Sequence, residues 1–258
     1  FTFATGFYQV RCLGRWLGAA LASRRKGEGE EGRLSSFQAL TAALAGSLGT
    51  GNIVGVGVAI ATGGPGALFW MWASALLGMM TVYAENVLAA RHRQAPGALG
   101  YIRAAGRWGK PLAAVYAGGC CLSSLGMGTM AQTHAAAASL SPLGVPAAAS
   151  ALGLGLLAFW VARGGVALGA KINQRLVPLM TLLFFGASLW VLWVFRENIP
   201  RAFASVFQGA FSLKAGAGGA AGALLALRTG VSRGVFTNEA GLGSSAGAYQ
   251  GVEGRAPE

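Results

Sequence analysis

Charged residues are scarce in this sequence. Only 11% of its 258 residues are charged, while 54% are hydrophobic and the mean hydropathy is positive. This balance leaves too little polar surface to coat a soluble globule of this size, so a soluble domain is excluded. A membrane protein with several spans remains. Its fold class is all-α, a polytopic helical bundle, because backbone groups in hydrocarbon must pair within their own segment.

Residues that carry enzyme chemistry are sparse as well. The three cysteines, Cys12, Cys120 and Cys121, have neither metal-ligand nor disulfide spacing. The apolar segments contain no paired carboxylates and no nucleophile with a nearby base, which argues against a membrane enzyme. We therefore expect no catalytic residues and no enzymatic cofactor.

Apolar stretches recur along the chain at roughly the length that a bilayer core requires. Turn signals rich in glycine and proline, such as "TGGPG" and "SPLGVP", separate them. The predicted spans are 36–62, 66–90, 111–140, 146–162 and 174–195, with a less regular sixth near 229–250.

The net charge of +12 comes from basic residues that fall between the spans. They do not form a stripe with interleaved aromatic residues, so nucleic acid is not an expected partner. Six precede the first span, five follow the second and three follow the fourth, whereas the turns at 63–65 and 141–145 carry none. By the positive-inside rule the alternate connections face the cytoplasm, and the first span runs outward.

The first span is interrupted at its centre by "GSLGTGNIVG" (46–55). A helix that unwinds within the membrane frees backbone groups, which must find other partners. Gly49 and Gly51 permit the unusual backbone, and Thr50 and Asn52 add a hydroxyl and an amide. The half-helix after the break directs its positive end at this point, which suits a carboxylate, while freed carbonyls suit sodium. The alternative is that these glycines only allow close helix packing.

A second interruption is predicted at "GVFTNEAGLGSSAG" (234–247). Two interrupted segments in different parts of a bundle indicate a secondary transporter built from inverted repeats, with its site at the repeat interface. A competing interpretation is an ordinary helix N-terminus, with Asn238 as its cap and Glu239 in its first turn.

Two polar residues on apolar helices have alternative interpretations. Gln132 either contacts a substrate or only bonds a neighbouring helix. Glu85 is either an ion or proton carrier or, six residues before Arg91 at the cytoplasmic end of a span, the acidic partner in an interfacial salt bridge. For Glu85 we favour the salt bridge.

The spacing of the two interruptions suggests a division of the chain. We expect the tail of a leading helix and a cytoplasmic linker at 1–35, then a first five-helix repeat at 36–196. An extracellular connection follows at 197–228, and the first, broken helix of a second repeat at 229–258.

Three stretches carry a resemblance to a known family. "GTGNIVGVGVAIATGGPGALFWMWASALLGMMTVYAE" (49–85), "GMGTMAQTHA" (126–135) and "RGVFTNEAGLGSSA" (233–246) resemble the alanine or glycine:cation symporter family, the sodium:alanine carriers of prokaryotes. The resemblance covers nearly the whole chain from Phe7 onward. It implies a LeuT-type fold with one additional leading helix, in the cytoplasmic membrane.

The resemblance also implies site residues. Backbone amides of Thr50 and Gly51 would bind the substrate carboxylate, and Asn52 would serve both substrate and sodium. Carbonyls of Ala45 and Leu48 would contribute to a partial sodium site. Phe236 would wall the pocket for a small side chain, Asn238 and Gly241 would lie beside the substrate amine, and Gln132 would close the site.

The expected function is therefore sodium-coupled symport of alanine or glycine by alternating access. The rivals are a passive pore or facilitator, and an inactive membrane fragment. The inactive fragment is an alternative because the family pattern implies about four more helices after Glu258. The sequence also begins without Met, and we expect the chain to be truncated at both ends.

Overall fold

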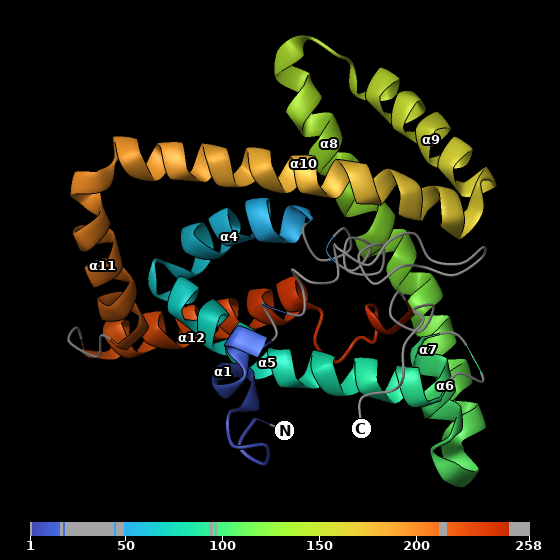
Figure 1. Ribbon diagram of the computed structural model, residues 1–258. Helices are drawn as coiled ribbons and strands as arrows, with labels where there is room; N and C mark the ends of the chain where they lie inside the picture. The colour runs from blue at the N-terminus through green and yellow to red at the C-terminus, as the bar shows by residue number, and fades with distance from the viewer. Residues whose placement is uncertain are drawn as a thin grey trace.

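The computed structural model describes residues 2–15, 18, 44, 49–92, 95, 97–211 and 216–247 (Figure 1). All regular secondary structure in these residues is helical, which confirms the predicted all-α class. The α-helices are α1 (Tyr8–Arg11), α4 (Thr50–Gly63), α5 (Gly66–Arg91), α6 (Ala98–Arg103), α7 (Gly109–Ser123), α8 (Ala131–Leu140), α9 (Ala147–Arg163), α10 (Gly165–Val194), α11 (Ile199–Phe211) and α12 (Gly216–Asn238).

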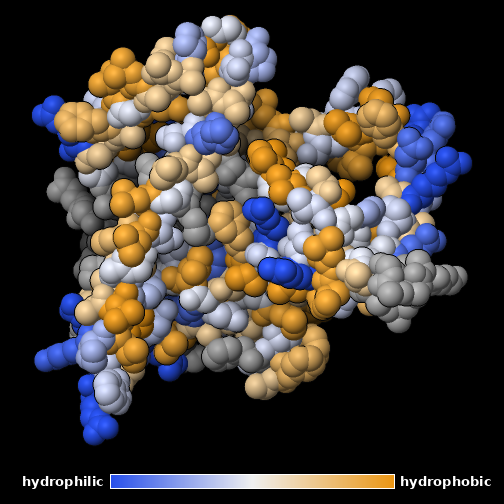
Figure 2. All heavy atoms as spheres, turned by 180° about the vertical axis from the view of Figure 1, so that it is seen from behind, coloured by the Kyte–Doolittle hydropathy of each residue, from blue (hydrophilic) through white to orange (hydrophobic). Residues whose placement is uncertain are grey.

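Several helices have the lateral surface of a membrane protein. Gly66–Arg91, Gly106–Leu143 and Lys171–Val194 are long and apolar enough to cross a bilayer, and Asn52–Gly63 and Ala147–Arg163 are apolar but shorter. Large apolar side chains lie on the outside, and Leu182 for example is 71% exposed. Apolar residues spread over much of the face in Figure 2. Such a surface is unfavourable in water and suited to hydrocarbon, so the predicted membrane class is confirmed.

The predicted spans 66–90 and 146–162 agree closely with α5 and α9, but α10 differs from its prediction. It begins at Gly165 rather than at 174 and continues through Pro178. The sequence interpretation assigned Lys171 to a connection because of its charge. Charged side chains near a helix end can reach the membrane interface while the backbone remains helical, so charge did not mark the helix start.

The predicted span 111–140 lies within one continuous helical rod. A short 3₁₀ turn leads into α7, and a π-helical segment, Ser124–Met130, joins α7 directly to α8. Figure 1 shows this rod running from the lower right to the top of the molecule. Single π-helical turns within α-helices are frequent at functional sites, and this one ends just before Gln132.

The sixth segment is the largest departure from prediction. The expected connection 197–228 contains α11 and the first half of α12, and α12 ends at Asn238, inside the interruption predicted at 234–247. Its first half is rich in glycine and alanine, a composition that carries little helical periodicity. Packing against α5 stabilises this helix where the sequence pattern alone did not indicate it.

Small residues allow α12 to approach α5 closely. A Cβ atom at Gly230 would collide with the backbone carbonyl oxygen of Ala67, and one at Gly234 would lie 2.8 Å from the Cβ of Ser74. On the neighbouring helix α4, Gly63 packs in the same way against Thr229 of α12. Glycine at these positions therefore serves close helix packing, which is typical of helix pairs in membranes.

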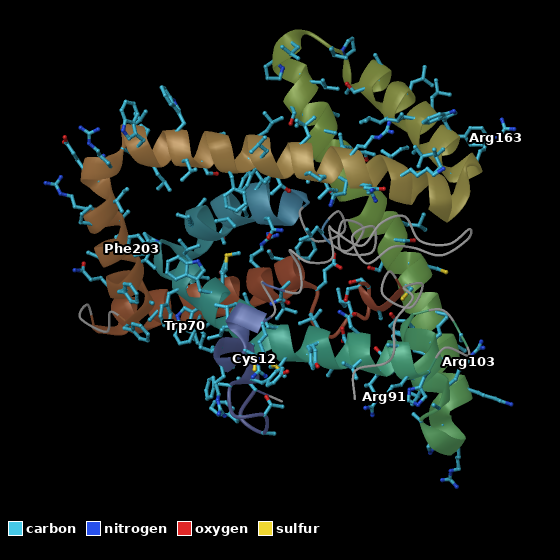
Figure 3. The ribbon with its side chains drawn as sticks, in the orientation of Figure 1. Cys12, Trp70, Arg91, Arg103, Arg163 and Phe203 are labelled. Carbon is cyan, nitrogen blue, oxygen red and sulfur yellow. The ribbon has the colours of Figure 1, made fainter. Side chains whose placement is uncertain are left out.

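Aromatic residues fasten α11 to α5 at the other end of the bundle from the basic connections. Phe211 lies 4.7 Å from Phe69 and 5.7 Å from Trp70, measured between ring centroids. Figure 3 shows Trp70 and Phe203 towards the left of the view and Arg91, Arg103 and Arg163 towards the right. Two connections that the charge pattern assigns to the cytoplasm thus lie at one side of the molecule, as a common orientation requires.

Candidate functional site

The first predicted interruption lies at Gly49. Leu44 is helical, Gly49 has extended backbone angles (φ −105°, ψ −163°), and α4 begins at Thr50. The amide of Asn52 donates to the carbonyl oxygen of Gly49 at 3.1 Å, which starts the helix. Amides in the first turn of a helix have no acceptor within that helix, so those of Thr50 and Gly51 are directed out of this helix end. These are the donors assigned to the substrate carboxylate.

Gln132 is brought directly to this interruption. A Cβ atom at Gly49 would lie 2.8 Å from Nε2 of Gln132, so any other residue would have to displace this amide. Gln132 lies in the first turn of α8, immediately after the π-helical segment. Gln132 was expected to close the site at the first interruption, and the structure places its side-chain amide beside Gly49 there. Ala45 and Leu48, the predicted sodium ligands, lie outside the described residues.

The second interruption follows α12. The helix ends at Asn238, and Glu239, Gly241 and Gly243 have positive φ angles of 54°, 91° and 67°. The chain is helical again at Ala246, whose amide donates to the carbonyl oxygen of Gly243. The interruption predicted within 234–247 is therefore present: residues 239–245 are not helical, and the positive φ angles fall at 239–243. The competing interpretation, with Asn238 as an N-cap, is wrong because Asn238 is the last residue of α12.

Asn238 is oriented by α5 and by its own turn. Its Nδ2 donates to the carbonyl oxygen of Ser74 at 3.4 Å, and its Oδ1 accepts from the amide of Ala240 at 2.9 Å. Gly78 provides the space, since a Cβ there would lie 2.6 Å from Nδ2. Gly241, by contrast, borders open space within 4 Å of its Cβ position. Phe236 is half-buried in the last turn of α12.

The two interruptions lie at the same end of one helix pair. Gly63, at the end of α4, packs against Thr229 of α12, and the two helices run in opposite directions (Figure 1). The start of α4 at Thr50 and the end of α12 at Asn238 are therefore both at the opposite end of the pair from Gly63. This arrangement assembles the candidate site from segments far apart in the sequence.

Glu85 belongs to the second interruption: among the described residues it bonds a backbone amide of that segment, and not a basic side chain as the favoured interfacial salt bridge required. The residue is 9% exposed, and its Oε2 accepts a hydrogen bond from the amide of Gly243 at 3.3 Å. Burial raises the pKa of Tyr101 on the adjacent α6 above its ordinary value, and the charge of Glu85 adds to this rise. The signal in the sequence was the carboxylate within an apolar helix, because such groups are usually functional.

The described residues contain no cluster of three or more His, Cys, Asp or Glu side chains that could hold a metal ion. A sodium ion does not require such a cluster, because carbonyl, hydroxyl and amide oxygens are suitable ligands for a hard cation. The first interruption would offer ligands of that kind from its backbone and from Asn52. Any contribution from Ala45 and Leu48 falls in the part of the chain that the structure does not describe.

Two interrupted helices that meet within an apolar bundle are typical of membrane transporters. The chain belongs to the sodium:alanine symporter family, whose model matches residues 1–257. It is 39% identical over 243 residues to the sodium/alanine symporter AgcS of Methanococcus maripaludis, covering 90% of this chain and 53% of the relative.

Two relatives from Bacillus subtilis match over a similar extent. The putative sodium/proton-dependent alanine carrier protein YrbD is 35% identical over 239 residues, 90% of this chain and 48% of the relative. The probable sodium/glutamine symporter GlnT is 35% identical over 249 residues, which cover 90% of this chain and 49% of the relative. The chain thus spans about half the length of the curated relatives it matches. The family and these relatives are transporters rather than enzymes.

Proposed function

We propose that this chain forms part of a secondary active transporter that couples the entry of sodium to the uptake of a small neutral amino acid, alanine or glycine, across the cytoplasmic membrane. The single observation that carries the proposal is the meeting of Gly49 and Gln132 at an interrupted helix whose partner, α12, is interrupted at the same end. The names of AgcS and YrbD support alanine as the substrate.

The chemistry of each interruption suits one part of an amino acid. The amides of Thr50 and Gly51 bind the carboxylate at the positive end of α4. Asn238 and Gly241 lie beside the amine, Phe236 limits the side chain, and Gln132 closes the site from α8. The carbonyls of Ala45 and Leu48, together with Asn52, bind sodium.

The coupling follows from a shared structure. Sodium binding to freed backbone oxygens orders the interruptions, and this order raises the affinity for the amino acid. The bundle then exposes the site to the other side in a LeuT-type cycle. One sodium ion gains about 2.3 kcal/mol from a potential of about 100 mV. A tenfold sodium gradient adds about 1.4 kcal/mol, and together these support roughly several-hundred-fold accumulation.

Uptake of labelled alanine by the complete protein in proteoliposomes tests this proposal. An imposed sodium gradient should accumulate alanine above the outside concentration, and unlabelled glycine should compete. Glutamine, the substrate named for GlnT, should compete weakly, because Phe236 limits the pocket. Equilibration without accumulation would instead show the passive facilitator that the sequence left open. Accumulation that is independent of the sodium gradient and depends on a proton gradient would contradict sodium coupling.

A further inference from the structure

One peptide group in the second interruption is held by side chains on both of its polar atoms. The carbonyl oxygen of Leu242 accepts a hydrogen bond from the hydroxyl of Tyr116, on α7, at 2.7 Å. The amide of Gly243, in the same peptide group, donates to Oε2 of Glu85, on α5, at 3.3 Å. Helices α5 and α7, both more than 100 positions earlier in the sequence, therefore meet at the Leu242–Gly243 peptide.

Close packing surrounds this peptide. Gly243 has a φ angle of 67°, and a Cβ atom there would lie 2.6 Å from the Cβ of Ala98 and 3.0 Å from the hydroxyl oxygen of Tyr116. The hydroxyl oxygen of Tyr101, on α6, would be 3.2 Å away. The left-handed backbone and the lack of space both require glycine. The position of Gly243 is thus determined by α5, α6 and α7 together.

A further hydrogen bond joins α5 to the chain just after the Leu242–Gly243 peptide. The hydroxyl of Ser245 donates to Oδ1 of Asn86, the residue after Glu85, at 2.9 Å. A buried carboxylate needs partners, since an unpaired charge in an apolar bundle is very unfavourable. Glu85 finds one in the backbone amide of Gly243, which lies in the interruption and has no helical acceptor. The carboxylate of Glu85 and the amide of Gly243 thus each find a hydrogen-bond partner in the other.

We propose that Glu85 and Tyr116 are positioning residues that fix the Leu242–Gly243 peptide from opposite sides and so hold the second interruption in its binding conformation. In this role the two residues hold the backbone and not a ligand. Their effect on transport acts through the backbone of 239–243, and this part of the inference rests on the proposed function.

Hydrogen exchange tests the contact itself, without any need for transport. Amide exchange in a peptide covering 239–247 is measured by mass spectrometry on the complete purified protein. Glu85→Leu, which removes the acceptor at similar volume, should raise exchange about tenfold or more, because bonds to charged groups are the stronger ones. Glu85→Gln keeps the shape and one acceptor oxygen, so it should lie between Glu85→Leu and the unaltered protein. Tyr116→Phe should also raise exchange.

Two substitutions serve as matched controls. Glu197→Gln removes an exposed carboxylate in the turn after α10. Tyr83→Phe removes a hydroxyl from α5 on a ring that lies 6.1 Å from the ring of Tyr8, measured between centroids. Both should leave exchange in 239–247 unchanged. If Glu85→Leu does not fold, exchange in Glu85→Gln compared with the unaltered protein still tests the contact. Equal exchange in Glu85→Gln, Tyr116→Phe and the unaltered protein would overturn the proposal.

Alanine uptake tests the consequence. The KM for alanine should rise about tenfold in Tyr116→Phe and less in Glu85→Gln, with sodium dependence retained. Loss of sodium dependence in Glu85→Gln with unchanged exchange would identify Glu85 as an ion ligand and overturn the positioning role. If the unaltered protein shows no sodium-driven uptake, the proposed function fails, while the exchange measurement still decides whether the two residues hold the peptide.

Discussion

Gly49 lies directly against the side-chain amide of Gln132, with only 2.8 Å between Nε2 and the place where a Cβ atom would stand. This contact joins the extended residue before α4 to the first turn of α8. This contact is a steric reason for glycine at position 49, where the extended backbone alone would accept other residues. A substitution there must displace Gln132, which is flexible, rather than break the fold.

Gly49→Ala should therefore weaken substrate binding while the protein remains folded. Displacing one amide from the site should raise the KM for alanine about tenfold, which corresponds to about 1.4 kcal/mol. Gly57→Ala on the same helix is the matched control, because nothing lies within 4 Å of its Cβ position. Equal KM values for both variants in proteoliposome uptake would contradict a role for the Gly49–Gln132 contact.

A second prediction concerns the packing of α12 on α5. Gly230→Ala places a methyl group against the backbone of Ala67, so the helices must separate. The free energy of unfolding should fall by about 1–3 kcal/mol, as is usual for overpacking. Gly222→Ala, in the same helix with open space at its Cβ position, should be neutral or slightly stabilising.

Thermal unfolding of the purified protein measures both variants of α12. The Tm of Gly230→Ala should lie clearly below that of Gly222→Ala. If the two melt together, the close approach of α12 and α5 does not stabilise the protein, and the assignment of these glycines to helix packing fails.

The sequence allowed good prediction where composition reflects a local requirement. Gly49 and Thr50 were recognisable because a cluster of glycines and polar residues inside an apolar span is typical of a broken helix at a binding site. The 239–243 interruption was recognisable for the same reason.

The partner of Glu85 could not be predicted in this way. Glu85 and Gly243 are 158 positions apart, and only tertiary packing brings them together. The position of Glu85, six residues before Arg91, favoured an interfacial salt bridge instead. The start of α12 was missed for a related reason, because glycine and alanine at 216–228 carry no strong pattern and the helix depends on α5 for its stability.

A third prediction concerns Asn238, whose amide links the end of α12 to α5. Asn238→Ala removes the bonds to the Ser74 carbonyl and the Ala240 amide, which together should contribute about 1–3 kcal/mol to stability. We expect a lower Tm and a higher KM for alanine. Asn198→Ala, at an exposed position after α10, should change neither. An unchanged KM with a lower Tm would assign Asn238 to structure alone.

Equilibrium binding of labelled alanine to the complete purified protein tests the central claim most directly, because it needs neither a membrane potential nor turnover. The account predicts saturable binding in sodium, loss of that binding when choline replaces sodium, and about tenfold weaker binding in Gly49→Ala. Binding of equal affinity in sodium and in choline would contradict the claim that a cation and an amino acid share the two interruptions.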